Sequence, residues 1–207
     1  MSDSRLHIWL DAERMKYPNT GLYHFCMELG TALSAVRTSK EELTFYLPGK
    51  LEGCFGKEVR YMPQQIFHKL YLPALGKIDV WHAMQQDSEY YPRHRIIPTV
   101  LTVHDLNFLH QPGKGSSSVK RALDRLQSKV NRAQYIVTIS SFVLEELKEH
   151  INLGTVPTSV IYNGCNFSSV QPREPKVLPH RPFLFTIGTV AAKKKLSCAS
   201  CFVGKEG

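Results

Sequence analysis

Short apolar segments of strand length alternate with longer, amphipathic segments along most of this chain. In the segment that starts at Gly21, apolar residues recur every three to four positions, which is the spacing of one buried helix face. The pattern predicts strands at residues 6–10, 43–47, 59–62, 78–83, 98–105, 135–140 and 159–164, and helices at residues 21–36, 64–75, 119–130 and 141–151. Because strands that alternate with helices form parallel βαβ units, we expect an α/β fold with a doubly wound parallel sheet.

The composition fits a soluble globular protein. Of the 207 residues, 43% are hydrophobic, which is enough for a large buried core. The net charge of +8 favours anionic partners, but the basic residues are dispersed and lack the aromatic-rich basic motifs of nucleic-acid binders, so we expect no nucleic acid. The N-terminus has no signal-peptide pattern, and no apolar run is long enough to span a membrane. Five cysteines without the spacing of a disulfide framework suit a reducing compartment, so we expect a cytoplasmic protein.

Polar residues directly follow several of the expected strands. Open parallel sheets bind their ligands beyond the carboxyl ends of the strands, where such residues gather. We expect His104 to face a cleft, with Asp105 holding the loop or the imidazole in place. The other candidates at strand ends are Thr20 and Gly21 within residues 11–21, His82, Ser140 and Asn163.

Each of these candidates also has a structural interpretation. Thr20 and Gly21 can form a simple turn at the start of a helix. His82 can be a residue at the edge of the core, and Asn163 can form a turn with the glycine that follows it. The residues alone leave both interpretations open.

Six segments of the chain together carry a resemblance to a known family. They are NTGLYHFCMELGTAL, IDVWHA, PTVLTVHDLNFLHQP, AQYIVTISSFVLEEL, SVIYNGCN and FLFTIGTVAAKK. In this order they resemble the N-terminal half of a GT-B glycosyltransferase of family 4, a group of retaining enzymes that use sugar nucleotides, and they span about residue 5 to residue 194. The resemblance implies a Rossmann-like sheet. It also implies transfer of a hexosyl group from a nucleotide sugar to a glycan or lipid-linked acceptor, as in polysaccharide biosynthesis, with no cofactor and no metal.

The resemblance implies roles for the candidate residues. In this family the histidine at the end of the VLTVHD-like strand lies beside the donor sugar, which is the implied role of His104. Backbone amides near Thr20 and Gly21, at a helix N-terminus, would be offered to a donor phosphate. Lys194 would bind the donor diphosphate, which suits the point charge of an ammonium group. Contacts with donor or acceptor are also implied for His82, Ser140 and Asn163.

The resemblance also predicts a domain organisation. Residues 1–170 would form the N-terminal, acceptor-side domain, residues 171–182 a proline-rich linker, and residues 183–207 the first strand of a C-terminal donor-binding domain followed by an aberrant tail. Members of the family continue through a complete second Rossmann-like domain, so we expect a truncated chain that is inactive by itself. A shift of reading frame within the codons of the consecutive lysines would explain the tail.

Two other classes of protein stay open. A sugar-nucleotide epimerase of GT-B fold would share the sheet but use different carboxylates in its cleft. A non-catalytic module that binds anions would fit the positive net charge. The basic side chains of the helix at residues 119–130 fit either a solvated face or peripheral contact with an anionic membrane.

Overall fold

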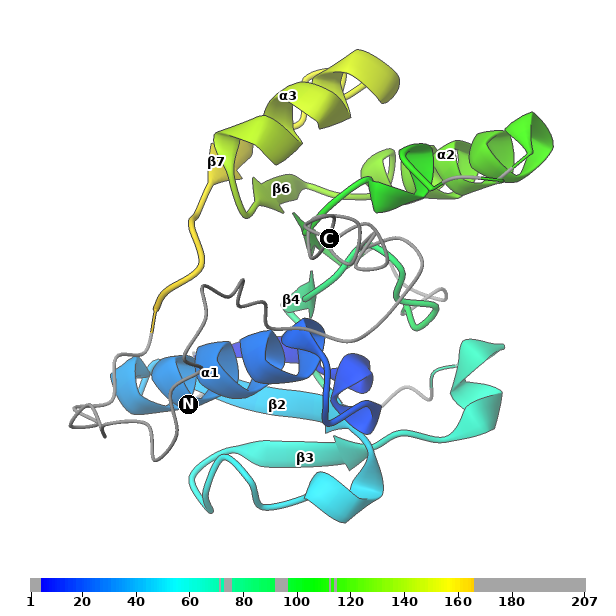
Figure 1. Cartoon of the computed structure of the whole chain (residues 1–207). Coiled ribbons are helices and arrows are strands. Elements are labelled where there is room, and N and C mark those ends of the chain that lie inside the picture. Colours follow the sequence, from blue (N-terminus) through cyan, green and yellow to red (C-terminus); the bar gives the residue numbers. More distant parts are fainter. Residues whose placement is uncertain are drawn as a thin grey trace, which may run out of the picture.

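A single parallel sheet of seven strands organises the computed structural model, which describes residues 5–70, 72, 76–91, 97–111, 113 and 115–165 (Figure 1). The strands are β1 (Leu6–Asp11), β2 (Glu41–Leu47), β3 (Arg60–Pro63), β4 (Val80–Ala83), β5 (Thr99–Val103), β6 (Tyr135–Thr138) and β7 (Thr158–Val160). Their order across the sheet is β3-β2-β1-β4-β5-β6-β7, and every neighbouring pair is parallel. The predicted α/β, Rossmann-like doubly wound sheet is therefore confirmed.

Three α-helices connect the strands, together with four short 3₁₀ turns. The helices are α1 (Gly21–Val36), α2 (Ser116–Val130) and α3 (Ser141–His150), and the turns are η1 (Glu13–Lys16), η2 (Gly49–Leu51), η3 (Ile66–Lys69) and η4 (Asn107–Leu109). The predicted helix at residues 64–75 is wrong where the structure describes it, because only the single turn η3 forms there. The predicted strand at residues 159–164 is also too long, since β7 ends at Val160.

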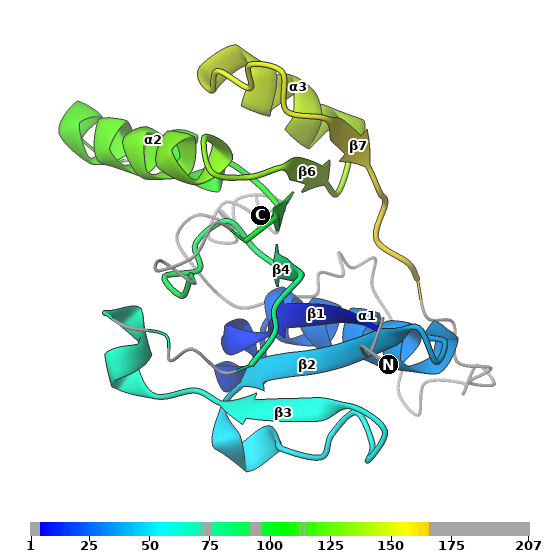
Figure 2. The same cartoon turned by 180° about the vertical axis from the view of Figure 1, so that it is seen from behind.

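Two apolar cores cover the two faces of the sheet. Successive strand residues point to opposite faces, so Trp9 of β1 packs in one core and its neighbour Leu10 in the other. The core that contains Trp9 also holds buried residues of α2 and α3, whereas the core that contains Leu10 holds Cys26 of α1. Helix α1 accordingly lies against β1 and β2, whereas α3 lies beside β6 and β7 and α2 extends beyond β6 on the other side in both views (Figures 1 and 2).

Close packing between α1 and β2 depends on a glycine. A Cβ atom added to Gly30 would lie 2.5 Å from a ring carbon of Phe55. That ring is stacked on Phe45 of β2, with 4.1 Å between the ring centroids, so it has little room to move. Gly30 therefore sets how closely α1 approaches the sheet.

Several predictions concern residues that the structure does not describe. The proposed linker at residues 171–182, the strand and tail at residues 183–207, and the diphosphate contact at Lys194 all lie outside the described residues.

Candidate active site

The order of the strands creates a crevice between β1 and β4. From β1 the chain proceeds through β2 to β3 on one side, and from β4 it proceeds to β7 on the other side. Asp11 at the end of β1 is paired in register with Ala83 at the end of β4. Ligands of open α/β sheets bind at such a switch point, outside the carboxyl ends of the strands. The loops that follow β1, β4 and β5 are therefore the place to look for a site.

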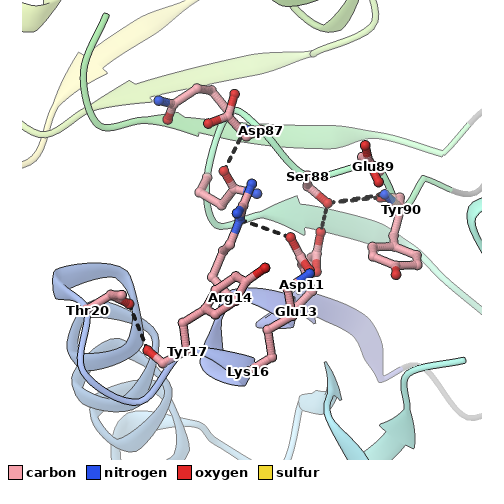
Figure 3. A network of polar contacts seen from close by, with 12 residues as sticks. Asp11, Glu13, Arg14, Lys16, Tyr17, Thr20, Asp87, Ser88, Glu89 and Tyr90 are labelled. Atoms are coloured by element: carbon pink, nitrogen blue, oxygen red, sulfur yellow. Dashed lines mark hydrogen bonds and ion pairs between the residues drawn. The ribbon is translucent and has the colours of Figure 1, made fainter. Parts of the chain in front are cut away.

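Asp11 is a buried carboxyl group at the carboxyl end of β1, beside the switch point, and belongs to a network of polar contacts (Figure 3). Its side chain is 1% exposed. The Ser88 hydroxyl in the loop after β4 donates to Oδ2, and the Glu13 amide donates to Oδ1 at 3.1 Å. Burial raises the pKa of Asp11 to about 7, although the Ser88 hydrogen bond opposes this rise. Asp11 can therefore gain or lose a proton near neutral pH.

A second buried carboxylate, Glu13, lies in η1 next to Asp11. It is held by two cations of the same turn: Arg14 Nε lies 3.0 Å from one carboxylate oxygen, and Lys16 Nζ lies 2.8 Å from the other. These ion pairs compensate the charge that burial of Glu13 would otherwise leave unpaired. The β1 to α1 connection is thereby fixed beside the crevice.

The side chain of Gln86 joins the loops after β4 and β5. Its Nε2 donates to the carbonyl oxygen of Asp105 at 2.9 Å, and its Oε1 accepts the amide of His104 at 3.1 Å. Lys129 of α2 donates to the carbonyl oxygen of Gln86 itself. One glutamine thus satisfies backbone groups that these loops would otherwise leave unpaired.

His104 lies at the carboxyl end of β5, as predicted, but only 9% of the residue is exposed. Its Nε2 lies 2.9 Å from the carbonyl oxygen of Met84, and its ring meets the ring of Phe25 in α1 edge-on at 4.5 Å between centroids. A carbonyl can only accept, so Nε2 carries the proton and Nδ1 keeps a lone pair. Burial lowers the pKa of His104, and the imidazole is therefore neutral at pH 7.

Asp105 holds its loop rather than the imidazole. Its Oδ1 accepts the amide of Asn107 at 3.0 Å, and no hydrogen bond within the described part of the chain joins it to the His104 ring. The first of the two predicted roles for Asp105 therefore agrees with the observed contacts.

His82 lies inside β4 and not beyond its end, which corrects the predicted position. Its Nε2 lies 2.9 Å from the hydroxyl oxygen of Thr102 on the neighbouring strand. Burial, with a smaller contribution from His104, lowers the pKa of His82 to about 4. This imidazole is therefore neutral and already has a partner within the sheet, while its binding role stays a prediction.

Thr20 and Ser140 each cap a helix. The Thr20 hydroxyl accepts the amide of Tyr23 at the start of α1, and the Ser140 hydroxyl accepts the amide of Val143 at the start of α3. Gly21 is the first residue of α1, and no atom lies within 4 Å of a Cβ built there. The structural interpretation of these residues is thus observed, and their contacts with substrate stay predictions.

The predicted residues do not form a single cluster. His82 lies in β4, and His104 and Asp105 directly follow the neighbouring strand β5. Ser140 follows β6, and the exposed Asn163 follows β7, so both lie further along the sheet. No group of three potential metal ligands occurs among the residues that the structure describes.

Glu13, Gln86 and Ser88 contribute to this site but were not predicted from the sequence. For Gln86 and Ser88 the available signal was the run Gln-Gln-Asp-Ser at residues 85–88, one residue after the strand expected at residues 78–83. Short polar side chains at a strand end are the same signal that singled out His104.

The architecture defines the class of the protein. The seven-stranded parallel sheet with helices is Rossmann-like and is consistent with the N-terminal half of a GT-B fold. The family model of Glycosyltransferase Family 4 matches residues 30–169, more than half of the chain. The chain therefore belongs to glycosyltransferase family 4. No curated protein matches it.

Within the described part of the chain, no helix is both long enough and apolar enough to cross a membrane.

Proposed function

We propose that the described domain is the acceptor-side half of a retaining glycosyltransferase. The enzyme would transfer a hexosyl group from a nucleotide sugar to a glycan or a lipid-linked acceptor. The observation that carries the proposal is the polar crevice between β1 and β4 in a domain of family 4. No metal or cofactor is required in this proposal, since the nucleotide sugar is a substrate.

His104 is the residue we assign to the donor sugar. Its neutral imidazole keeps a lone pair on Nδ1, because Nε2 donates to the Met84 carbonyl. A sugar hydroxyl can donate to that nitrogen. Gln86 and Asp105 act as positioning residues in this proposal, since they fix the loop that carries His104.

The start of α1 is our candidate contact for the donor phosphate. The Thr20 hydroxyl already occupies the Tyr23 amide, which leaves the amides of Gly21 and Leu22 as the donors at this end. In the same proposal Lys194 binds the diphosphate, and Ser140 and Asn163 contact substrate further along the sheet.

We place the reaction in the cytoplasm, with peripheral contact to an anionic membrane. Cys26, Cys54 and Cys165, the cysteines in the described part of the chain, are free thiols, which supports a reducing compartment. Lys120, Arg121 and Arg125 are exposed on α2 and offer positive charge to anionic lipid.

The test is a binding and turnover assay on the 207-residue chain. A panel of nucleotide sugars is incubated with oligosaccharides and prenyl-linked saccharides, complexes are detected by native mass spectrometry, and products are analysed by NMR for anomeric configuration. We expect acceptor saccharides to bind, and any transfer product to keep the donor configuration. Epimerised or hydrolysed nucleotide sugar without transfer would instead support the epimerase.

A matched pair of histidine variants locates the site. His104→Ala should weaken saccharide binding about tenfold or more, whereas His110→Ala should leave it unchanged, because His110 is exposed and paired with Glu146. Thermal melts of both variants check that the fold is intact. Equal effects of the two variants, or no saccharide binding by the wild-type chain, would contradict the proposed site.

A further inference from the structure

A pocket of about 900 Å³ opens beside the crevice, between α2 and the loops that follow β4 and β5. Gln86 and Asp105, which fix the loops of the candidate active site, are among its lining residues. The wall opposite these loops is formed by Arg125, Lys129 and other residues of α2. The pocket is therefore continuous with the candidate active site but faces α2.

Cations outnumber carboxylates in the wall of this pocket. The cations are Arg14, Lys69, Arg125, Lys129 and Arg132, and the carboxylates are Asp87, Glu89 and Asp105. The carboxylates are partly occupied already, because Glu89 is paired with Lys69 and Asp105 accepts the Asn107 amide.

The cations on the α2 side form no close ion pair with a carboxylate of the described residues. Arg125 and Arg132 have no salt bridge within the described part of the chain. Lys129 donates to the Gln86 carbonyl, and burial lowers the pKa of its ammonium group, although the charges of Asp87, Asp11 and Glu89 oppose this shift. An anion in the pocket would stabilise all three charges.

Tyr91 gives an independent reason to expect a ligand. This residue lines the pocket and is 7% exposed, yet its hydroxyl has no hydrogen-bond partner among the described residues. A buried hydroxyl is costly to leave unpaired. The Arg132 guanidinium lies over the Tyr91 ring, 5.3 Å from its centroid, so a cation packs against this side chain.

We propose that this pocket binds the phosphate group of a phosphate-bearing acceptor, either a sugar phosphate or a lipid phosphate. Arg125, Lys129, Arg132 and the Tyr91 hydroxyl all supply donors, which suits an anion with several acceptor oxygens. Each planar guanidinium group can donate two parallel hydrogen bonds to two oxygens of one phosphate. The volume exceeds what a free phosphate ion fills, so the phosphate belongs to a larger molecule. The role of the bound molecule as acceptor rests on the proposed function, whereas phosphate binding by the pocket does not.

The experiment is calorimetric titration of the whole chain at low salt with three probes: inorganic phosphate, a hexose phosphate and a short-chain alkyl phosphate. The free hexose and the alkyl alcohol are the neutral controls. We expect the phosphate-bearing probes to bind and the neutral ones not to bind. The tighter of the hexose and alkyl probes identifies the source of the phosphate, and equal binding of all three phosphates would overturn the assignment to a larger molecule.

Arginine variants on the same helix locate the anion. Arg125→Gln should weaken binding about tenfold, whereas Arg121→Gln should change it less than twofold. Both remove one exposed positive charge from α2, but only Arg125 lines the pocket, while Arg121 bonds the Ser117 carbonyl. Equal loss in the two variants means a diffuse charge effect and overturns the proposal.

Tyr91→Phe tests the unpaired hydroxyl without altering charge. We expect several-fold weaker binding and a melting temperature that is unchanged or higher, because a buried polar group without a partner has been removed. Binding unchanged from wild type would overturn the role of Tyr91. Failure of the proposed function is distinguishable, because a chain that binds hexose phosphate in calorimetry but no acceptor saccharide keeps the phosphate site and loses only the acceptor role.

Discussion

Replacing Asp11 with asparagine should remove a pH dependence of stability that the buried carboxyl group creates. The folded-state pKa of Asp11 is about 7, raised mainly by burial, against an ordinary value of 3.8. Between these values the folded protein holds a proton that the unfolded chain releases. The stabilisation is therefore complete below pH 3.8 and is lost as the pH rises through about 7. The difference of about three pH units, each worth about 1.4 kcal/mol, amounts to a loss on the order of 4 kcal/mol.

Urea unfolding of wild type and Asp11→Asn, at intervals from about pH 4 to pH 8.5, measures this effect. The asparagine cannot ionise, and its Oδ1 can keep the hydrogen bond from the Glu13 amide. The variant should therefore gain stability relative to wild type as the pH rises from about 3.8, with the midpoint of the change between the two pKa values and a plateau above about 7. Ser88→Ala removes a donor that lowers this pKa and should move the midpoint upward. Parallel pH profiles of wild type and Asp11→Asn would refute the reasoning.

Two pairs of variants test the packing and capping of helices. Gly30→Ala should destabilise the protein by about 1–3 kcal/mol, because its Cβ would overlap the Phe55 ring. Gly21→Ala should be within about 0.5 kcal/mol of wild type, because its Cβ would meet no other atom. Equal melting temperatures of the two variants would contradict this account. Ser140→Ala should cost about 1 kcal/mol in urea unfolding by removing the cap of α3, and Ser141→Ala should cost less. A larger loss for the second serine variant would place the cap elsewhere.

The fold was predictable because strand and helix patterns are local. The apolar run at Thr99–Val103 and the helical spacing in Gly21–Val36 identify their elements without any knowledge of partners. The error at residues 64–75 has a tertiary cause. His68 is buried and its Nδ1 lies 3.2 Å from the Tyr46 hydroxyl, while the apolar Ile66 and Phe67 beside it are exposed. The apolar residues of this segment therefore do not form a buried helix face. The segment contacts the core through His68, which a search for apolar spacing does not consider.

The candidate site was predictable only in part, since its partners are distant in sequence. A histidine after an apolar strand pointed to the crevice, but the carbonyl that fixes the imidazole of His104 belongs to Met84, 20 residues earlier. The hydrogen bond from Ser88 to Asp11 spans 77 residues. Positions of single residues follow from local patterns, whereas the protonation states of Asp11 and His104 depend on burial that only the assembled sheet creates.

Lys129 links the phosphate site to Asp11 through charge. Its ammonium group lines the pocket, and its positive charge lowers the pKa of Asp11. A bound phosphate would offset that charge, so Asp11 should hold its proton more tightly when the pocket is filled. Urea unfolding with saturating hexose phosphate should therefore show the midpoint of the wild-type stability loss moved to higher pH, with no such shift for Arg125→Gln at the same ligand concentration. An unchanged midpoint in wild type, with binding shown by calorimetry, would mean that the phosphate sits away from Lys129, at the Arg132 end of the pocket.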